Sequence, residues 1–82
     1  MKNVIQERLD RMGKEQKDLL DHFKESGRKV TQSHLNRVIR GEQNPTAWMM
    51  FGIADFFNCY PSEIFYPTRE EIYGGKNGQK KV

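Results

Sequence analysis

The sequence predicts a small all-α domain, and three observations support this. Apolar residues recur three and four positions apart through most of the 82 residues, which is the period of a helix packed on one side. No stretch alternates apolar and polar residues over the length that a half-buried strand needs. Glycines, prolines and capping residues divide the chain into short segments. We therefore expect one compact domain of five short helices, with an optional short sixth helix.

The first three helices are expected between residues 3 and 41. Asn3 is available to cap the first helix, and Gly13 stops it. The second helix covers about residues 15–26, with two leucines and a phenylalanine on one side. Thr31 caps the third helix, and Gly41 closes it.

The remaining helices are expected after a turn at 42–45, where an Asn-Pro pair disfavours helix before the proline. A fourth helix covers residues 46–58 and begins with a threonine cap. A short fifth helix covers residues 62–65, directly after a proline. The Thr-Arg-Glu-Glu sequence within 68–73 is a capping box that starts the optional last turn.

Length and composition limit the class of protein. The helical domain is expected at 1–73, and the glycine- and lysine-rich residues 74–82 are expected to form a flexible basic tail. The single cysteine, Cys59, has no partner for an internal disulfide, which favours a reducing compartment. The longest apolar run, 48–57, is far shorter than the roughly 20 residues of a membrane span. The N-terminus has no signal-peptide pattern, so we expect a cytoplasmic protein without a membrane partner.

Charge is concentrated in one internal segment. The formal net charge is +3, but residues 28–41 carry four basic side chains and no acidic one. Residues 42–73 carry one basic and five acidic side chains. A local positive field attracts polyanions such as DNA. A solvated helix face gives the same pattern, so charge alone leaves both interpretations open.

The third helix has the most distinctive surface. At about 100° per residue, its apolar side chains gather on one side, and these are Leu35, Val38 and Ile39. The other side combines two amides, a hydroxyl and two guanidinium groups, from Gln32, Ser33, Asn36, Arg37 and Arg40. Amide side chains can pair with adenine and arginine with guanine. This side is therefore either a base-reading surface or an ordinary exposed helix face.

Two segments resemble the helix-turn-helix of the Cro and phage-repressor (XRE-like) family, Glu-Gln-Lys-Asp-Leu-Leu at 15–20 and Thr-Gln-Ser-His-Leu-Asn-Arg-Val-Ile-Arg-Gly at 31–41. The resemblance continues through Asn-Pro-Thr at 44–46 and Glu-Ile-Phe at 63–65, and it covers about residues 3–66. It implies a compact lambda-repressor-like domain of five helices, whose third helix enters the major groove of double-stranded DNA. The connection between the second and third helices is about five residues longer than is usual in the family.

The resemblance also implies roles for individual residues. Gln16 matches a glutamine that touches a phosphate and braces the first recognition residue, here Gln32. We expect Val30 to dock in the core, which leaves Arg28 and Lys29 beside the duplex backbone, although the family pattern has no counterpart for these two. The residues expected to read bases are Gln32, Ser33, Asn36 and Arg37. Those expected at the DNA backbone are Gln16, Lys17, Arg28, Lys29, Arg40 and Asn44.

Eight of the nine aromatic residues follow residue 47. Core packing accounts for Phe51, Phe57 and Phe65, and Cys59 is expected to be a small core residue. A small domain that exposes an apolar stripe usually buries it in a partner. We expect a homodimer whose interface includes Trp48, Met49, Phe56, Tyr60, Tyr66 and Tyr73. The alternative is packing within the chain, for example with residues 66–73 folded back.

The sequence indicates binding rather than catalysis. His22, His34 and Cys59 lack the paired spacing of zinc ligands, and no phosphate loop or nucleophile motif is present. We expect no metal, no cofactor, no small-molecule substrate and no enzymatic activity. We predict a sequence-specific double-stranded DNA-binding transcriptional regulator, of the small phage or mobile-element repressor kind, on an inverted-repeat operator. The alternatives are an antitoxin-like DNA-binding module with a protein partner and a protein-interaction adaptor on the same fold.

Overall fold

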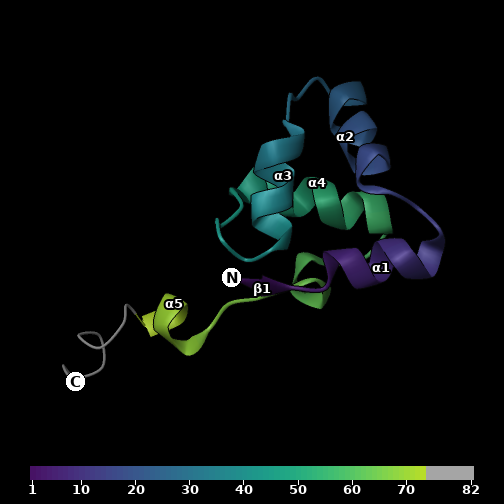
Figure 1. The fold of residues 1–82 in the computed structure, drawn as a ribbon. Helices are drawn as coiled ribbons and strands as arrows, with labels where there is room; N and C mark the ends of the chain where they lie inside the picture. Colours follow the sequence, from purple (N-terminus) through teal and green to yellow (C-terminus); the bar gives the residue numbers. More distant parts are fainter. Residues whose placement is uncertain (74–82) are drawn as a thin grey trace.

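The computed structural model describes residues 1–73, which are mostly helical (Figure 1). The tail expected at 74–82 lies outside the described residues. The elements in chain order are β1 (Lys2–Asn3), α1 (Ile5–Met12), α2 (Gln16–Glu25), α3 (Gln32–Ile39), α4 (Ala47–Phe57), the 3₁₀ helix η1 (Pro61–Glu63), β2 (Phe65–Tyr66) and α5 (Arg69–Tyr73). The predicted helical class is confirmed, and the first four helices lie within about two residues of their expected bounds.

Two capping side chains act as the sequence predicts. The Thr31 hydroxyl accepts the backbone N–H of His34 at 3.1 Å, at the start of α3. At the start of α5 the Thr68 hydroxyl accepts the backbone N–H of Glu71 at 3.2 Å, and the Glu71 carboxylate accepts that of Thr68 at 2.7 Å. This reciprocal pair is the expected capping box, and it satisfies two N–H groups that a helix start leaves without partners.

Asn3 has a wider role than the cap that the sequence predicts. The cap position of α1 is Val4, and the side chain of Asn3 reaches past it to accept the Ile5 N–H at 3.1 Å. The Asn3 amide nitrogen also donates to the Val38 carbonyl at 2.9 Å and to the Ile39 carbonyl at 3.3 Å. One side chain therefore satisfies backbone groups at the start of α1 and at the end of α3.

A pair of short strands is a feature that the sequence did not predict. β1 and β2 pair antiparallel, with Asn3 opposite Phe65, and the Val4 N–H donates to the Ile64 carbonyl at 3.0 Å. The helix expected over 62–65 is therefore wrong in its second half, because the chain leaves η1 and extends into β2. Strands of two residues are too short to show alternation, so only the tertiary contact reveals them.

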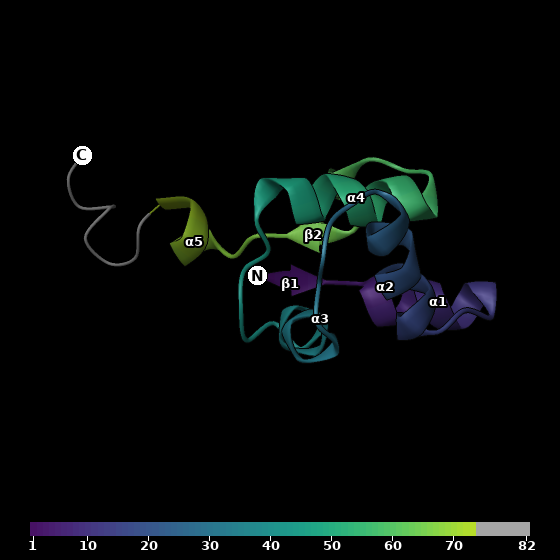
Figure 2. The same cartoon turned by 90° about the horizontal axis from the view of Figure 1, so that it is seen from above.

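The helices α1 to α4 enclose one apolar core. In Figure 1, α2 and α3 stand side by side and α4 crosses behind them, with α1 below. Figure 2 is seen from above and places α3 and α4 on opposite sides of the β1–β2 pair. The buried apolar residues come from all four helices and from the segment around β2: Ile5, Leu9, Leu19, Phe23, Leu35, Val38, Met49, Ile53, Ala54, Phe57, Ile64 and Phe65.

α4 turns a different side inward from the one expected. Met49 is fully buried, and Ile53 and Phe57 follow it at intervals of four residues, whereas Phe51 is 64% exposed. The expectations of Phe51 in the core and of Met49 at a dimer interface are therefore wrong. α4 is apolar around nearly its whole circumference, so its sequence pattern does not fix which side faces the core.

Gly52 allows α2 to pack closely on α4. A Cβ atom at this position would lie 2.3 Å from Cε1 and 2.9 Å from Cζ of Phe23, so the phenyl ring occupies the space of the missing side chain. The same ring meets the Trp48 ring edge-on, with 5.8 Å between the ring centroids. Gly52 therefore allows the Phe23 ring of α2 to lie directly against α4.

Candidate nucleic-acid interface

α3 divides its side chains between core and surface as the sequence predicts. Leu35 and Val38 are fully buried, and Ile39 is half-buried against the core. The expected base-reading residues lie on the opposite side of the helix. Of the polar residues there, Asn36 is half-buried and the exposed ones are Gln32, Ser33, Arg37 and Arg40.

A chain of amide hydrogen bonds connects α3 to α2 and α1. The Nε2 of Gln32, the first residue of α3, donates to Oε1 of Gln16, the first residue of α2, at 2.6 Å. Gln16 in turn donates to Gln6 Oε1 at 3.0 Å, and Gln6 donates to Asp10 Oδ1 at 3.0 Å. The contact between Gln16 and Gln32 that the resemblance implies is therefore present, and the longer connection between α2 and α3 does not prevent it.

Arg37 is held by two neighbours on its own side of the domain. Its Nε donates to Gln43 Oε1 at 3.0 Å, and its Nη1 donates to the Ser33 hydroxyl at 3.1 Å. The other end of the Gln43 amide, Nε2, lies 3.1 Å from Nε2 of His34. Within residues 1–73 no hydrogen bond uses the Nη2 group of Arg37, so that end of the guanidinium can meet a ligand.

Gln6, His34 and Gln43 belong to this surface, although the sequence did not single them out for it. Gln6 stands four residues before Asp10 on α1, and that helical spacing was a signal for one of its bonds. Gln43 meets α3 only because the loop after α3 returns over the helix. No local pattern predicts this return, so the sequence alone could not predict the contact between Gln43 and Arg37.

Two arginines expected at the DNA backbone already have partners within the chain. The Arg28 guanidinium carbon lies 4.8 Å from the centroid of the Trp48 ring on α4, in a cation–π arrangement. Arg40 Nη1 lies 3.5 Å from Glu42 Oε2, and both side chains are exposed. An exposed pair of this kind contributes little to stability, so a phosphate could take the place of the carboxylate. The other basic residues expected at the backbone are Lys17 and Lys29, and both are exposed.

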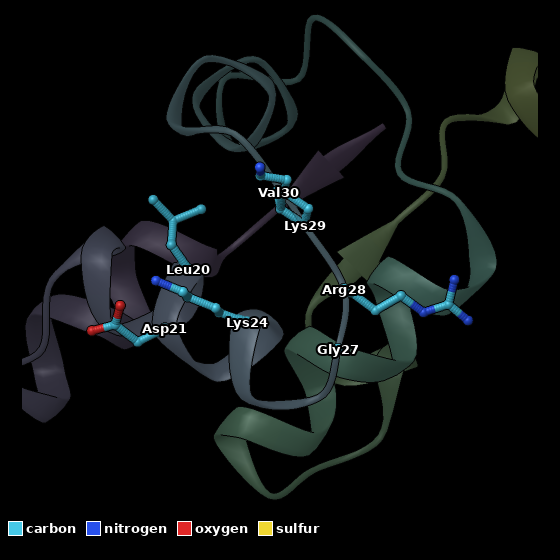
Figure 3. A pocket seen from close by; sticks show the side chains of 7 residues that line it. All are labelled: Leu20, Asp21, Lys24, Gly27, Arg28, Lys29 and Val30. Atoms are coloured by element: carbon cyan, nitrogen blue, oxygen red, sulfur yellow. The ribbon is translucent and has the colours of Figure 1, made fainter.

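An open cleft of about 470 Å³ lies between α2 and the connection to α3. Val30 and Leu20 are half-buried and pack on the core, which for Val30 was expected. Figure 3 shows Arg28 extending away from Leu20 and Lys24, toward α4. The cleft is basic overall, since three cationic side chains and one carboxylate line it. The lining residues are Leu20, Asp21, Lys24, Gly27, Arg28, Lys29 and Val30.

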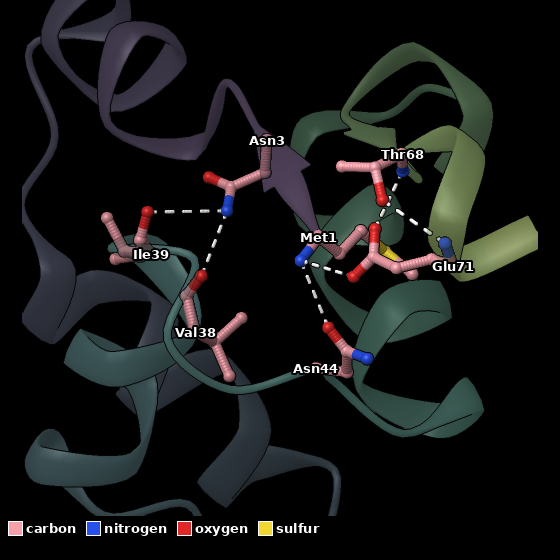
Figure 4. A network of polar contacts seen from close by, with 7 residues as sticks. All are labelled: Met1, Asn3, Val38, Ile39, Asn44, Thr68 and Glu71. Atoms are coloured by element: carbon pink, nitrogen blue, oxygen red, sulfur yellow. Dashed lines mark hydrogen bonds and ion pairs between the residues drawn. The ribbon is translucent and has the colours of Figure 1, made fainter. Parts of the chain in front are cut away.

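A polar cluster joins the N-terminus to α5 and to the loop before α4 (Figure 4). The Met1 ammonium lies 2.7 Å from Glu71 Oε2 and donates to Asn44 Oδ1 at 3.0 Å. The hydrogen bond from this ammonium, with a second from the Thr68 N–H, holds the pKa of the Glu71 carboxyl below its ordinary value. Asn44, which was expected at the DNA backbone, therefore has its side-chain oxygen engaged within the chain.

The six residues expected at a dimer interface fall into two groups. Met49 is in the core, and Trp48 and Phe56 are half-buried beside α2, where Phe56 meets the His22 ring edge-on at 5.5 Å between centroids. This half of the expected interface is therefore packed within the chain, as the alternative allowed. The other half is exposed and consists of Tyr60, Tyr66 and Tyr73.

The described residues hold no cluster of three or more His, Cys, Asp or Glu side chains that could bind a metal ion. Cys59 is half-buried at the edge of the core, and burial raises the pKa of its thiol. His22 instead pairs with Asp55, with 3.3 Å between Nε2 and Oδ2. Between residues 1 and 73, no helix has both the length and the apolar character needed to cross a membrane.

The chain has no significant match among protein-family models, curated proteins or solved structures.

Proposed function

We propose that this protein is a sequence-specific double-stranded DNA-binding transcriptional regulator of the Cro and phage-repressor kind. In this proposal α2 and α3 form a helix-turn-helix, and α3 is the recognition helix. One observation carries the proposal. α3 packs its apolar side on the core, with Leu35 and Val38 fully buried, and presents the amide of Gln32 and the guanidinium of Arg37 on an open surface.

The dimensions of α3 suit the major groove. An α-helix with its side chains is about 10–12 Å in diameter, and the groove is about 12 Å wide. Gln32 uses one amide N–H for its bond to Gln16, and its second N–H and its Oε1 are left for the N7 and N6 groups of an adenine. Arg37 keeps its Nη2 group for the O6 or N7 of a guanine.

Exposed basic side chains around this helix would position the domain on the phosphates. Lys17 at the start of α2 and Lys29 in the connection are exposed, and Arg40 ends α3. Such contacts supply affinity for any duplex and make it depend on salt, whereas the base contacts supply sequence preference. Bound at an operator, the protein would act by occupancy, because it would block or recruit the polymerase.

A second copy of the chain is the proposed protein partner. The exposed tyrosines of the segment 60–73 support self-association there, whereas Trp48, Met49 and Phe56 are used within the protomer. In a dimer that binds one face of the duplex, the two α3 helices stand about 34 Å apart and favour an inverted repeat. Sedimentation at high micromolar concentration tests this part, and a strict monomer would overturn it.

Selection of bound sites from a random pool of duplex DNA tests the proposal as a whole. We expect an enriched motif, with an affinity that falls steeply as salt rises. A palindromic motif would report specificity and dimer geometry together. Failure to enrich any sequence, with no duplex binding even at low salt, would contradict the proposal and favour the protein-interaction alternative.

A further inference from the structure

Gln43 lies outside α3, in the loop that leads to α4, and its side-chain amide contacts both Arg37 and His34. Its Oε1 faces Arg37 Nε at 3.0 Å, and its Nε2 faces His34 Nε2 at 3.1 Å. Both Gln43 and His34 are half-buried.

The donor at Arg37 Nε determines the orientation of the Gln43 amide, and that orientation determines the tautomer of His34. Arg37 Nε can only donate, so the Gln43 atom that faces it must be the carbonyl oxygen. The NH₂ end of the same amide then faces His34, and it also can only donate. His34 Nε2 must therefore accept, which requires a neutral ring with its proton on Nδ1.

We propose that Gln43 is a positioning residue that determines the specificity of Arg37, and that the neutral His34 ring sets the direction of the Gln43 amide. This inference rests on the proposed DNA-binding function. When His34 is protonated, its Nε2 becomes a donor and opposes the NH₂ group. The single carbonyl oxygen of the amide then lies between two donors. When it turns to accept from His34, its NH₂ end faces Arg37 Nε, and Arg37 loses one of its two holding bonds.

The charged residues of α3 and of the loop after it are Arg37, Arg40 and Glu42. Among the described residues no carboxylate lies within ion-pair distance of His34. On α3 the nearest charged group is Arg37, on the next turn. In the loop, Arg40 and Glu42 pair with each other at 3.5 Å. Protonation of His34 therefore adds a charge beside Arg37 without a carboxylate to receive it.

The first test uses the free protein and needs no DNA. The nitrogen chemical shifts of the two histidine rings, measured by NMR above the pH at which histidine titrates, distinguish the tautomers. We expect His34 in the Nδ1–H form. A ring mainly in the Nε2–H form would overturn the inference, because the Gln43 amide would then point the other way. His22, which faces Asp55 through Nε2, is the internal control.

The second test measures discrimination at the base pair that Arg37 reads, as the ratio of affinities for the selected duplex and for one substituted at that pair. Between about pH 8 and 5 we expect this ratio to fall about tenfold in the natural chain, since a specific arginine–guanine contact carries discrimination of that order. The ratio removes the general gain in DNA affinity that any protonated histidine brings.

Three variants separate the inference from a general effect of pH. Gln43→Glu should give a ratio that is flat with pH, because a carboxylate accepts from Arg37 and from a protonated His34 alike. His34→Ala should also be flat, whereas His22→Asn should keep the natural profile. A natural chain with a flat ratio, or a profile that His22→Asn abolishes, would overturn the inference. If no duplex is bound at all, the proposed function fails, and the tautomer of His34 still reports on the geometry around Gln43.

Discussion

Gln32 donates a hydrogen bond of 2.6 Å to Gln16, so that the first residue of α3 is tied to the first residue of α2. The bond joins the two helices across a connection of six residues, 26–31, which is longer than is usual in the family that the sequence resembles. A side chain held in this way loses less freedom when it meets a base, and it keeps the atoms that an adenine would use.

Gln16→Ala should weaken binding to the selected duplex by about 0.5–1.5 kcal/mol, the usual net contribution of one hydrogen bond. A cycle with Gln32→Ala, measured by fluorescence titration, should be non-additive because the two residues act as one unit. Lys17→Ala combined with Gln32→Ala is the control and should be additive. Additive losses for the glutamine pair would show that Gln16 does not support base reading.

Arg37→Ala should lose about 1–3 kcal/mol of specific affinity and relax the preference at one base pair. The matched variant, Lys29→Ala, should weaken binding to all duplexes equally and flatten the dependence on salt. Affinities for selected and scrambled duplexes at several salt concentrations separate the two effects. Equal losses on both duplexes from Arg37→Ala would contradict its assignment to a base.

Gly52→Ala should destabilise the fold by about 1–3 kcal/mol, because the new methyl group overlaps the Phe23 ring. The sign of the change in the free energy of unfolding is informative, because glycine-to-alanine at an open helix position stabilises by up to about 1 kcal/mol. Urea denaturation measures the free energy of unfolding. In a chain that carries Phe23→Leu, Gly52→Ala should cost less than it does in the natural chain. A stabilised Gly52→Ala protein would contradict the close packing of α2 on α4.

Met49→Ala should cost about 2–5 kcal/mol, as truncation of a fully buried side chain does. Phe51→Ser should change the free energy of unfolding by about 0.5 kcal/mol or less, because that ring is on the surface. Met49 and Phe51 are two residues apart and point to different sides of α4. Thermal or urea denaturation of the two variants therefore reports which side of the helix faces inward. The reverse order of the two losses would mean that the helix is turned as the sequence suggested.

The Glu71 carboxyl should titrate below its ordinary pKa, because the Met1 ammonium and the Thr68 N–H bind its charged form. A depressed folded pKa gives stability that is present above the unfolded pKa and is lost as the pH falls through the folded pKa. NMR titration of the carboxyl carbon measures the shift. Acetylation of the N-terminus should move the pKa back toward its ordinary value, and an unchanged value would show that the ammonium is not its partner.

Periodicity and caps were enough to predict α1 to α4 and the capping box of α5, because these depend on local chemistry. The phase of α4 was not predictable, since a helix that is apolar all round gives no signal for the side that Met49 takes. The β1–β2 pair was missed because each strand has two residues, and it forms only when the two segments meet.

The candidate site was predictable to a similar extent. The outward side of α3, with Gln32 and Arg37, follows from helical geometry alone. The residues that hold Gln16 and Arg37 in place could not be predicted in this way, because Gln6 belongs to another helix and Gln43 to a loop. The contact of Arg28 with Trp48 was not predicted either, since it joins the connection before α3 to α4. Side chains that act through tertiary contacts leave little trace in the local sequence pattern.

NMR mapping of the protein with its selected duplex tests the central claim most directly. If α3 reads DNA, the chemical shifts of the Gln32 side chain and of the Arg37 guanidinium should change when the duplex binds. The chemical shifts of the tyrosines in 60–73 should change only if two copies of the protein associate on the duplex. Shifts confined to the tyrosines, with the Gln32 and Arg37 signals unchanged in the presence of saturating duplex, would contradict it.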